Sequence, residues 1–193
     1  MLIIKDEGKS EESFMAADLE KLHLEFKEKV LKLIIKCHDR GIEMRPNNGL
    51  RDPFEQGRLW RQSRTAEEIQ EKIRDLEAQG APFLAECIRR VGPQHGNHVT
   101  DTPPGISWHQ WGEALDCFWV VDGKAEWSPK KLINGVNGYQ FYAEEAEIMG
   151  LNSGGHWKTF KDWPHLQLRK ASNAAKVMTL PEIDAAMKAR FGR

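Results

Sequence analysis

The sequence has no long hydrophobic run and no excess of one charge. Its 193 residues include 28 Lys and Arg against 29 Asp and Glu, which gives a formal net charge of -1. Composition therefore gives no reason to expect a nucleic-acid-binding surface or a polybasic membrane patch. No stretch approaches the roughly 18 consecutive apolar residues that a membrane-spanning helix requires. We expect neither a membrane span nor a nucleic-acid partner.

The N-terminal segment also lacks the core of a secretory signal. It reads MLIIKDEGKSEES, with only four apolar residues before the charges begin. A signal-peptide core needs roughly 7 to 15 apolar residues. We therefore expect the chain to be made in the cytoplasm without a signal peptide.

Cysteine is scarce, and its spacing is not that of a zinc knuckle. The three cysteines, Cys37, Cys87 and Cys117, are an odd number and form no C-x2-C pair. Each lies within an apolar pattern, and free cysteine is among the most frequently buried residues. We expect three buried free thiols.

Most of the chain shows helical spacing of its apolar residues. Thr65 and Glu68 form a capping box at the start of one such stretch, and Thr179 with Pro181 marks the start of another. The predicted helices cover 18–37, 53–62, 65–80, 82–91, 139–149 and 180–191.

Two stretches alternate with the period of a strand instead. Leu115 to Val121 is one, and Asp122-Gly123 then predicts a two-residue hairpin turn. The other is WPHLQL, with His165 and Gln167 on one face. The fold class is therefore α+β, a small antiparallel sheet packed by several helices. We expect one domain over 1–193, with a core of about 15–170, a helical insert at about 65–100 and a C-terminal helix at about 180–191.

Three of the polar residues on these strands are of metal-binding types. His109 and Asp116 are seven positions apart, and His165 lies on the second strand. If the two strands are neighbours, two imidazoles and a carboxylate converge, which is the ligand set of a catalytic zinc site with its fourth position open. Spacing alone leaves another interpretation open, with both histidines at the surface or hydrogen-bonded in the core and Asp116 as a turn carboxylate.

The motifs around these residues resemble a known family. SWHQWGEALD has the form S-x-H-x-x-G-x-A-x-D, and DWPHLQL has the form D-x-x-H followed by a polar residue. Together they resemble the zinc peptidases that include D-alanyl-D-alanine carboxypeptidases and dipeptidases and the L-alanyl-D-glutamate endopeptidases of phage endolysins. GGHWKTFKDWPHLQ looks closest to the endopeptidases, and GLRDPFEQGRLW is similar to an upstream family segment.

The resemblance implies a role for each matching residue. His109, Asp116 and His165 would bind one Zn2+ ion, Asp162 would be the general base, and Arg51 would stabilise the oxyanion. A further group would contact the substrate: Gln56, Ser107, His156, which stands where aspartate is common, and Trp157.

The sequence also departs from the family pattern. The segment before Arg51 is bulkier than usual, so Arg45 competes for the same assignment. The insert from Thr65 to about Gly105 is long, and we expect it to form a wall or lid of the cleft. His95 and His98 are spaced for a metal, but no cysteine or carboxylate cluster accompanies them, so a second zinc site is not favoured.

The resemblance implies a zinc peptidase that cuts peptidoglycan stem peptides between L-alanine and D-glutamate, and we expect the protein to be a monomer. Such an enzyme would be endolysin-like, from a phage or prophage, and would act on the cell wall after release by a holin or another route. A D-alanyl-D-alanine carboxypeptidase or dipeptidase with the same site residues is the alternative. A wall-binding module that has lost catalysis is less favoured, because all three ligands and Asp162 are present.

Overall fold

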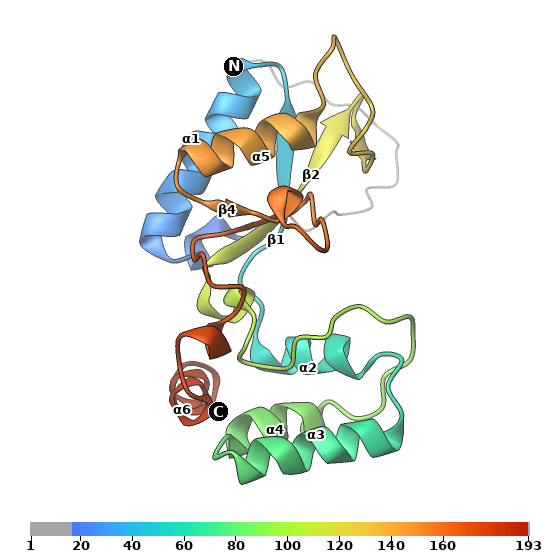
Figure 1. Ribbon diagram of the computed structural model, residues 1–193, viewed down its shortest axis with the longest axis vertical. Helices are drawn as coiled ribbons and strands as arrows, with labels where there is room; N and C mark the ends of the chain where they lie inside the picture. The colour runs from blue at the N-terminus through green and yellow to red at the C-terminus, as the bar shows by residue number, and fades with distance from the viewer. Residues whose placement is uncertain (1–16, 193) are drawn as a thin grey trace, which may run out of the picture.

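The computed structural model describes residues 17–192, so the expectation about the N-terminal segment lies outside the described residues. The predicted α+β class is confirmed (Figure 1). The α-helices are α1 (Leu24–Asp39), α2 (Pro53–Arg61), α3 (Ala66–Ala78), α4 (Pro82–Arg90), α5 (Gly138–Ile148) and α6 (Leu180–Phe191). The strands are β1 (Glu43–Asn48), β2 (Ala114–Val121), β3 (Lys124–Glu126), β4 (Asn152–Ser153) and β5 (His165–Gln167). No helix among the described residues is both long enough and apolar enough to cross a bilayer.

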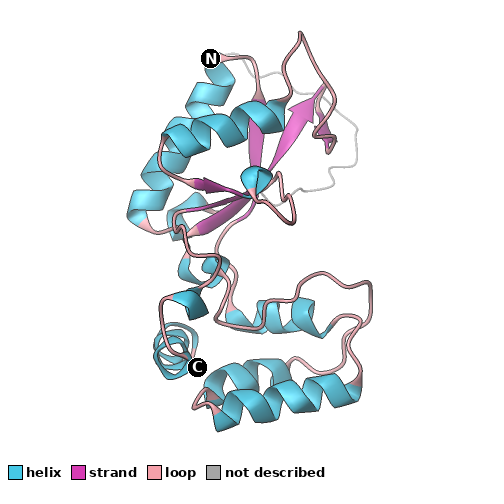
Figure 2. Ribbon diagram, viewed as in Figure 1, coloured by secondary structure: helices cyan, strands magenta, loops and turns pink. Residues whose placement is uncertain are grey.

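The sheet is antiparallel, with strand order β1-β2-β5-β4 and the short β3 paired to the end of β2. Figure 2 shows it in the upper half of the molecule, with helices beside it. The register of β2 against β5 places Asp116 directly opposite His165. Because a strand presents alternate side chains to opposite faces, Leu115 and Leu166 point to the other face, into the core.

Helices α1 and α5 cover that apolar face of the sheet (Figure 1). Phe26, Val30 and Leu33 recur along one side of α1 and are fully buried against it. The same cluster takes in Cys37 and Cys117, while Cys87 is buried in α4. The expectation of three buried free thiols is therefore confirmed, and burial raises the pKa of each of them to about 12.

The lower half of the molecule has a second apolar cluster, built by α2, α3, α4 and α6 (Figure 1). Helix α4 has no side-chain cap of its own, since its N-cap residue is Ala81. The buried carboxylate of Asp184 on α6 accepts a hydrogen bond from the Leu84 backbone N–H instead, at 2.9 Å. This contact satisfies a donor that the helix end leaves free, and it fixes α6 against α4.

Local sequence signals agree with the structure wherever the partner groups are close in sequence. The capping boxes at Thr65 and Thr179 are both present, and Asp122 and Gly123 take the left-handed conformations that the hairpin turn requires. The prediction of one helix over 18–37 was wrong at its start. A 3-10 turn over Leu19–Lys21 comes first, and α1 begins only at Leu24.

Candidate active site

His109 is presented by a single 3-10 turn, Trp108–Trp111, which precedes β2. The hydroxyl of Ser107 caps this turn by accepting from the His109 backbone N–H, at 3.3 Å. Gly112 then takes a left-handed conformation and directs the chain into β2. The turn, the glycine and the first residues of β2 account for the seven-residue spacing between His109 and Asp116.

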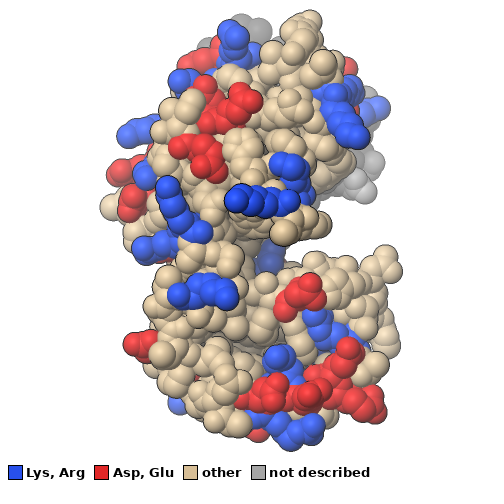
Figure 3. Space-filling model, in the orientation of Figure 1, with Lys and Arg blue, Asp and Glu red and all other residues tan. Residues whose placement is uncertain are grey.

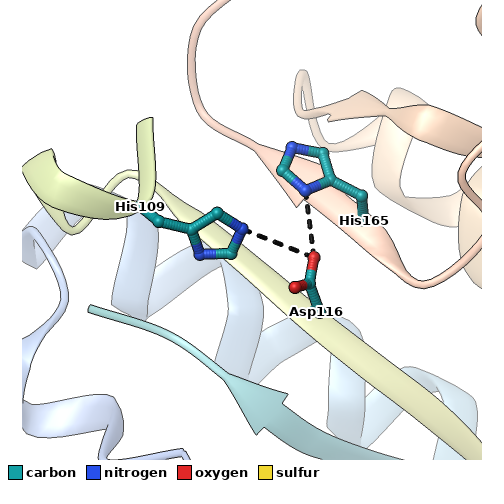
Figure 4. A group of neighbouring side chains, drawn as sticks. All are labelled: His109, Asp116 and His165. Carbon is teal, nitrogen blue, oxygen red and sulfur yellow. Dashed lines mark hydrogen bonds and ion pairs between the residues drawn. The ribbon is translucent and has the colours of Figure 1, made fainter. Parts of the chain in front are cut away.

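The three predicted metal ligands lie together above the sheet (Figure 4). Asp116 Oδ1 is 3.0 Å from His165 Nδ1 and 3.5 Å from His109 Nε2. One ligand atom from each residue lies within 4.8 Å of those of the other two. The separation along the sequence is large, but the register of β2 against β5 brings the carboxylate and the second imidazole together.

The donor set of this group fits a cation. His109 Nδ1 lies 2.8 Å from the carbonyl oxygen of Gly49, which can only accept, so the ring proton is on Nδ1 and Nε2 presents its lone pair to Asp116. The nitrogen lone pair and the carboxylate oxygens face one another, and this arrangement favours a positive charge between them. Burial alone would raise the pKa of the Asp116 carboxyl, but the imidazoles of His109 and His165, when they are protonated, outweigh burial and hold this pKa well below its usual range.

These side chains open into a cavity of about 590 Å³ between the two halves of the molecule. Figure 3 shows a hollow on this face between the upper and lower halves. Predicted site residues that line the cavity, besides the three ligands, are Arg51, Gln56, Ser107, Trp157 and Asp162.

Asp162 occupies its place because two glycines allow the chain to pack tightly. A Cβ atom on Gly154 would lie 2.3 Å from the Asp162 carbonyl oxygen, and one on Gly155 would lie 2.5 Å from the Trp163 ring. The Asp162 backbone is further held by the Gly154 carbonyl and by the His165 N–H. Burial raises the pKa of the Asp162 carboxyl, with Asp116 adding to the rise and His165 and His109 opposing it. A raised pKa is typical of a carboxylate that exchanges protons near neutral pH.

Arg51, and not Arg45, reaches the cavity. Arg51 is 9% exposed and donates from Nη1 to Gln56 Oε1 at 2.9 Å, while its buried Nε has no partner in the part of the chain that the structure describes. Arg45 pairs with Glu43 on the surface of β1. Of the two arginines, Arg51 lines the cavity and Arg45 does not, while the role of Arg51 stays a prediction.

Of the other residues predicted to contact substrate, Trp157 and Gln56 line the cavity and His156 does not. Trp157 lies over His165, with ring centroids 5.2 Å apart. Gln56 is 1% exposed, and its amide also donates to the Thr102 carbonyl at 2.7 Å. His156 is exposed, is absent from the cavity wall and lies 3.9 Å from Glu147. Its predicted contact with substrate stays a prediction.

The long insert contributes to the cavity through its loop. Residues 98–102 line the cavity wall, and contacts from α2 and the turn after it hold this loop, since Gln56 donates to the Thr102 carbonyl and Arg64 donates to the Thr100 carbonyl. His98 contacts Asp101 at 3.1 Å. Among the described residues, the pair His95 and His98 belongs to no group of metal-binding geometry.

Comparison with models of known protein families shows which family the chain belongs to. The family model VanY, described as D-alanyl-D-alanine carboxypeptidase, matches residues 19–143, more than half of the chain. The chain belongs to the VanY family. The predicted family and the predicted enzyme class, a metallopeptidase, are thereby confirmed at the level of the family.

The individual proteins that the chain resembles are distant. The peptidoglycan L-alanyl-D-glutamate endopeptidase CwlK of Bacillus subtilis is 28% identical over 150 residues, covering 76% of this chain and 73% of CwlK. Among solved structures, the L-Ala D-Glu endopeptidase ChiX of Serratia marcescens matches with a TM-score of 0.38 and 19% identity, over 78% of this chain and 83% of ChiX. A zinc complex of the vancomycin-resistance D,D-pentapeptidase VanY matches with a TM-score of 0.44 and 17% identity, over 84% of this chain and 83% of that one.

Sequence reasoning missed several residues that position the VanY-family site. Gly49 and Gln110 were not singled out, and Gln167 was noticed only for sharing a face with His165. Gln110 completes the cap under His109 by accepting from the Ser107 backbone N–H. The signal for Gln167 was present, because residues i and i+2 of a strand lie on one face.

Proposed function

We propose that the protein is a zinc-dependent endopeptidase that hydrolyses the L-alanyl-D-glutamate bond of peptidoglycan stem peptides. The observation that supports this most directly is the meeting of His109, Asp116 and His165 in one cavity with Asp162 and Arg51. Two imidazoles and one carboxylate are a ligand set that catalytic zinc sites use. The similarity to CwlK favours the endopeptidase within the family.

The residues of the cavity have different roles in the proposed hydrolysis. His109, Asp116 and His165 would hold the ion, which when bound supplies Lewis-acid activation of water and of the scissile carbonyl. Asp162 takes a proton from the attacking water on its carboxylate and returns it to the leaving amine. The Arg51 guanidinium stabilises the negative charge that develops on the carbonyl oxygen.

Charge in the cavity also favours an endopeptidase over a carboxypeptidase. A carboxypeptidase needs a cation for the free terminal carboxylate, in addition to the one that stabilises the oxyanion. Arg51 is the only lysine or arginine among the described residues that line the cavity. With Arg51 engaged at the scissile carbonyl, a free carboxylate would have no second guanidinium or ammonium group to bind.

We further propose that residues 1–193 act as one monomeric catalytic domain. The cavity draws its lining from both halves of the molecule, so neither half alone would form it. An endolysin-like role, in a phage or prophage setting with release to the wall by a holin or another route, follows from the resemblance of the GGHWKTFKDWPHLQ segment to phage endopeptidases.

Mass spectrometry of digested peptidoglycan tests the proposal. Zinc-loaded protein is expected to produce stem peptides with a new N-terminal D-glutamate. Released D-alanine would instead identify the D-alanyl-D-alanine carboxypeptidase. Folded, zinc-loaded protein that yields no product would leave the wall-binding module as the better description.

The two candidate arginines give a matched pair of variants. Arg51→Met is expected to lower kcat by roughly 10²–10³-fold, because one donor to a developing oxyanion is lost. Arg45→Met removes the same charge from the surface of β1 and is expected to leave kcat unchanged. Steady-state kinetics on a stem-peptide substrate measures both variants, and the reverse pattern would move the role to Arg45.

A further inference from the structure

The buried amide of Gln167 lies beside the metal-binding group without belonging to it. Gln167 follows His165 by two positions on β5, so both side chains lie on the same face of the strand. Gln167 is 1% exposed, and its Oε1 lies 3.3 Å from His165 Nε2. His165 Nδ1, on the other side of the ring, faces Asp116.

Two backbone carbonyls fix the orientation of this amide. The NH2 group of Gln167 donates to the carbonyl of Arg169 at 2.6 Å and to that of Ala171 at 2.9 Å. The opposite orientation would place Oε1 against two carbonyl acceptors at a position that is only 1% exposed, where unsatisfied polar groups are strongly disfavoured. Oε1 must therefore face His165, and the hydrogen bond requires a proton on His165 Nε2.

The segment that supplies these carbonyls is itself anchored. Arg169 forms a bidentate ion pair with the buried carboxylate of Glu113, at 2.5 and 2.8 Å. The Leu168 backbone N–H donates to the Glu113 carbonyl, and the Trp108 indole donates to the Ala171 carbonyl at 2.8 Å. The carbonyls of residues 169 and 171 are thus held in place before any metal binds.

We propose that Gln167 is a positioning residue that keeps the His165 proton on Nε2 and thereby leaves Nδ1 as the metal-binding nitrogen. The Gly49 carbonyl does the reverse for His109, where it keeps the proton on Nδ1 and leaves Nε2 for the metal. The two imidazoles would therefore bind through different nitrogens. Partners of this kind orient a ligating imidazole and typically change metal affinity by about 10–100-fold.

Metal affinity of paired variants tests this inference. Gln167→Met keeps the approximate volume and removes the acceptor, so we expect zinc affinity, measured by chelator competition, to fall by about 10–100-fold. Leu33→Ala, on the buried side of α1, controls for lost stability and is expected to bind zinc normally.

Nitrogen-15 NMR of the zinc-loaded, unsubstituted protein gives a second readout that needs no variant. We expect a slowly exchanging proton on His165 Nε2 and coordination through Nδ1, with the opposite pattern at His109. Coordination of His165 through Nε2, or a Gln167→Met variant that binds zinc as tightly as the unsubstituted protein, overturns the inference. If Gln167→Met does not fold, the NMR pattern alone decides.

The inference rests on the metal site of the proposed function and not on the scissile bond. Protein that binds zinc in the expected pattern but cleaves no stem peptide refutes the proposed reaction and leaves the role of Gln167 standing. Protein that cleaves stem peptides while Gln167→Met binds zinc normally refutes only the role of Gln167. A protein that binds no zinc refutes both.

Discussion

Asp162→Asn is expected to lower kcat for stem-peptide hydrolysis by roughly 10²–10⁴-fold, the usual contribution of a positioned general base. The amide has nearly the same shape as the carboxylate but cannot take a proton from the attacking water. The structure holds the Asp162 backbone through Gly154 and His165, so the fold is expected to survive the change. Zinc content should be unchanged as well, because Asp162 is not one of the three grouped ligands.

Asp122→Asn is the matched control for this variant. It makes the same chemical change in the hairpin turn, where a left-handed conformation suits asparagine. Rates, zinc content and circular dichroism are measured for both variants. An Asp162→Asn protein that keeps full kcat would show that Asp162 is not the general base and that another group in the cavity accepts the proton.

His109→Ala is expected to lower kcat by at least about 10³-fold, which corresponds to about 4 kcal/mol of lost transition-state stabilisation. The variant leaves two of the three grouped ligands, so zinc retained after dialysis is also expected to fall. Treatment of the unsubstituted protein with a chelator should give the same loss of activity, and added zinc should reverse that loss. Elemental analysis and activity measured on the same samples test the link between the two.

His38→Ala controls for the loss of an imidazole, since His38 is exposed on α1. Neither the chelated protein nor His109→Ala is expected to unfold, because two apolar clusters stabilise the molecule independently of the metal-binding group. Full activity in a metal-free sample, verified by elemental analysis, would contradict the zinc assignment.

The sequence predicted most of the elements because their signals are local. A capping box at Thr65, a hairpin turn at Asp122-Gly123 and the apolar stripe of α1 each depend on residues a few positions apart. The start of α1 was missed because its cause is not local. The His23 N–H donates to the Gly112 carbonyl, and Gly112 packs so closely that a Cβ atom there would lie 3.0 Å from the Lys21 carbonyl oxygen.

The site residues were also predictable only as far as local sequence signals reach. The spacing of His109 and Asp116 and the strand around His165 indicated the ligands, but only the register of β2 against β5 brings them together. The choice between Arg45 and Arg51 depended on which side chain turns inward, which the sequence pattern left open. The two-residue strand β4 is defined entirely by its pairing with β5, so no signal of its own could indicate it.

The separation of the two apolar clusters bears on how this architecture can diversify. The metal-binding side chains come from β2, β5 and the turn that leads into β2, whereas residues 98–102 line the cavity from the half whose apolar cluster is built mainly by helices and reaches the sheet through Trp108 and Ala114. Mutations that reshape residues 98–102 or the helices of that half can therefore alter which substrates fit while the ligand geometry stays intact. Lineages that share the same chemistry could acquire new specificities by remodelling one half of the molecule alone.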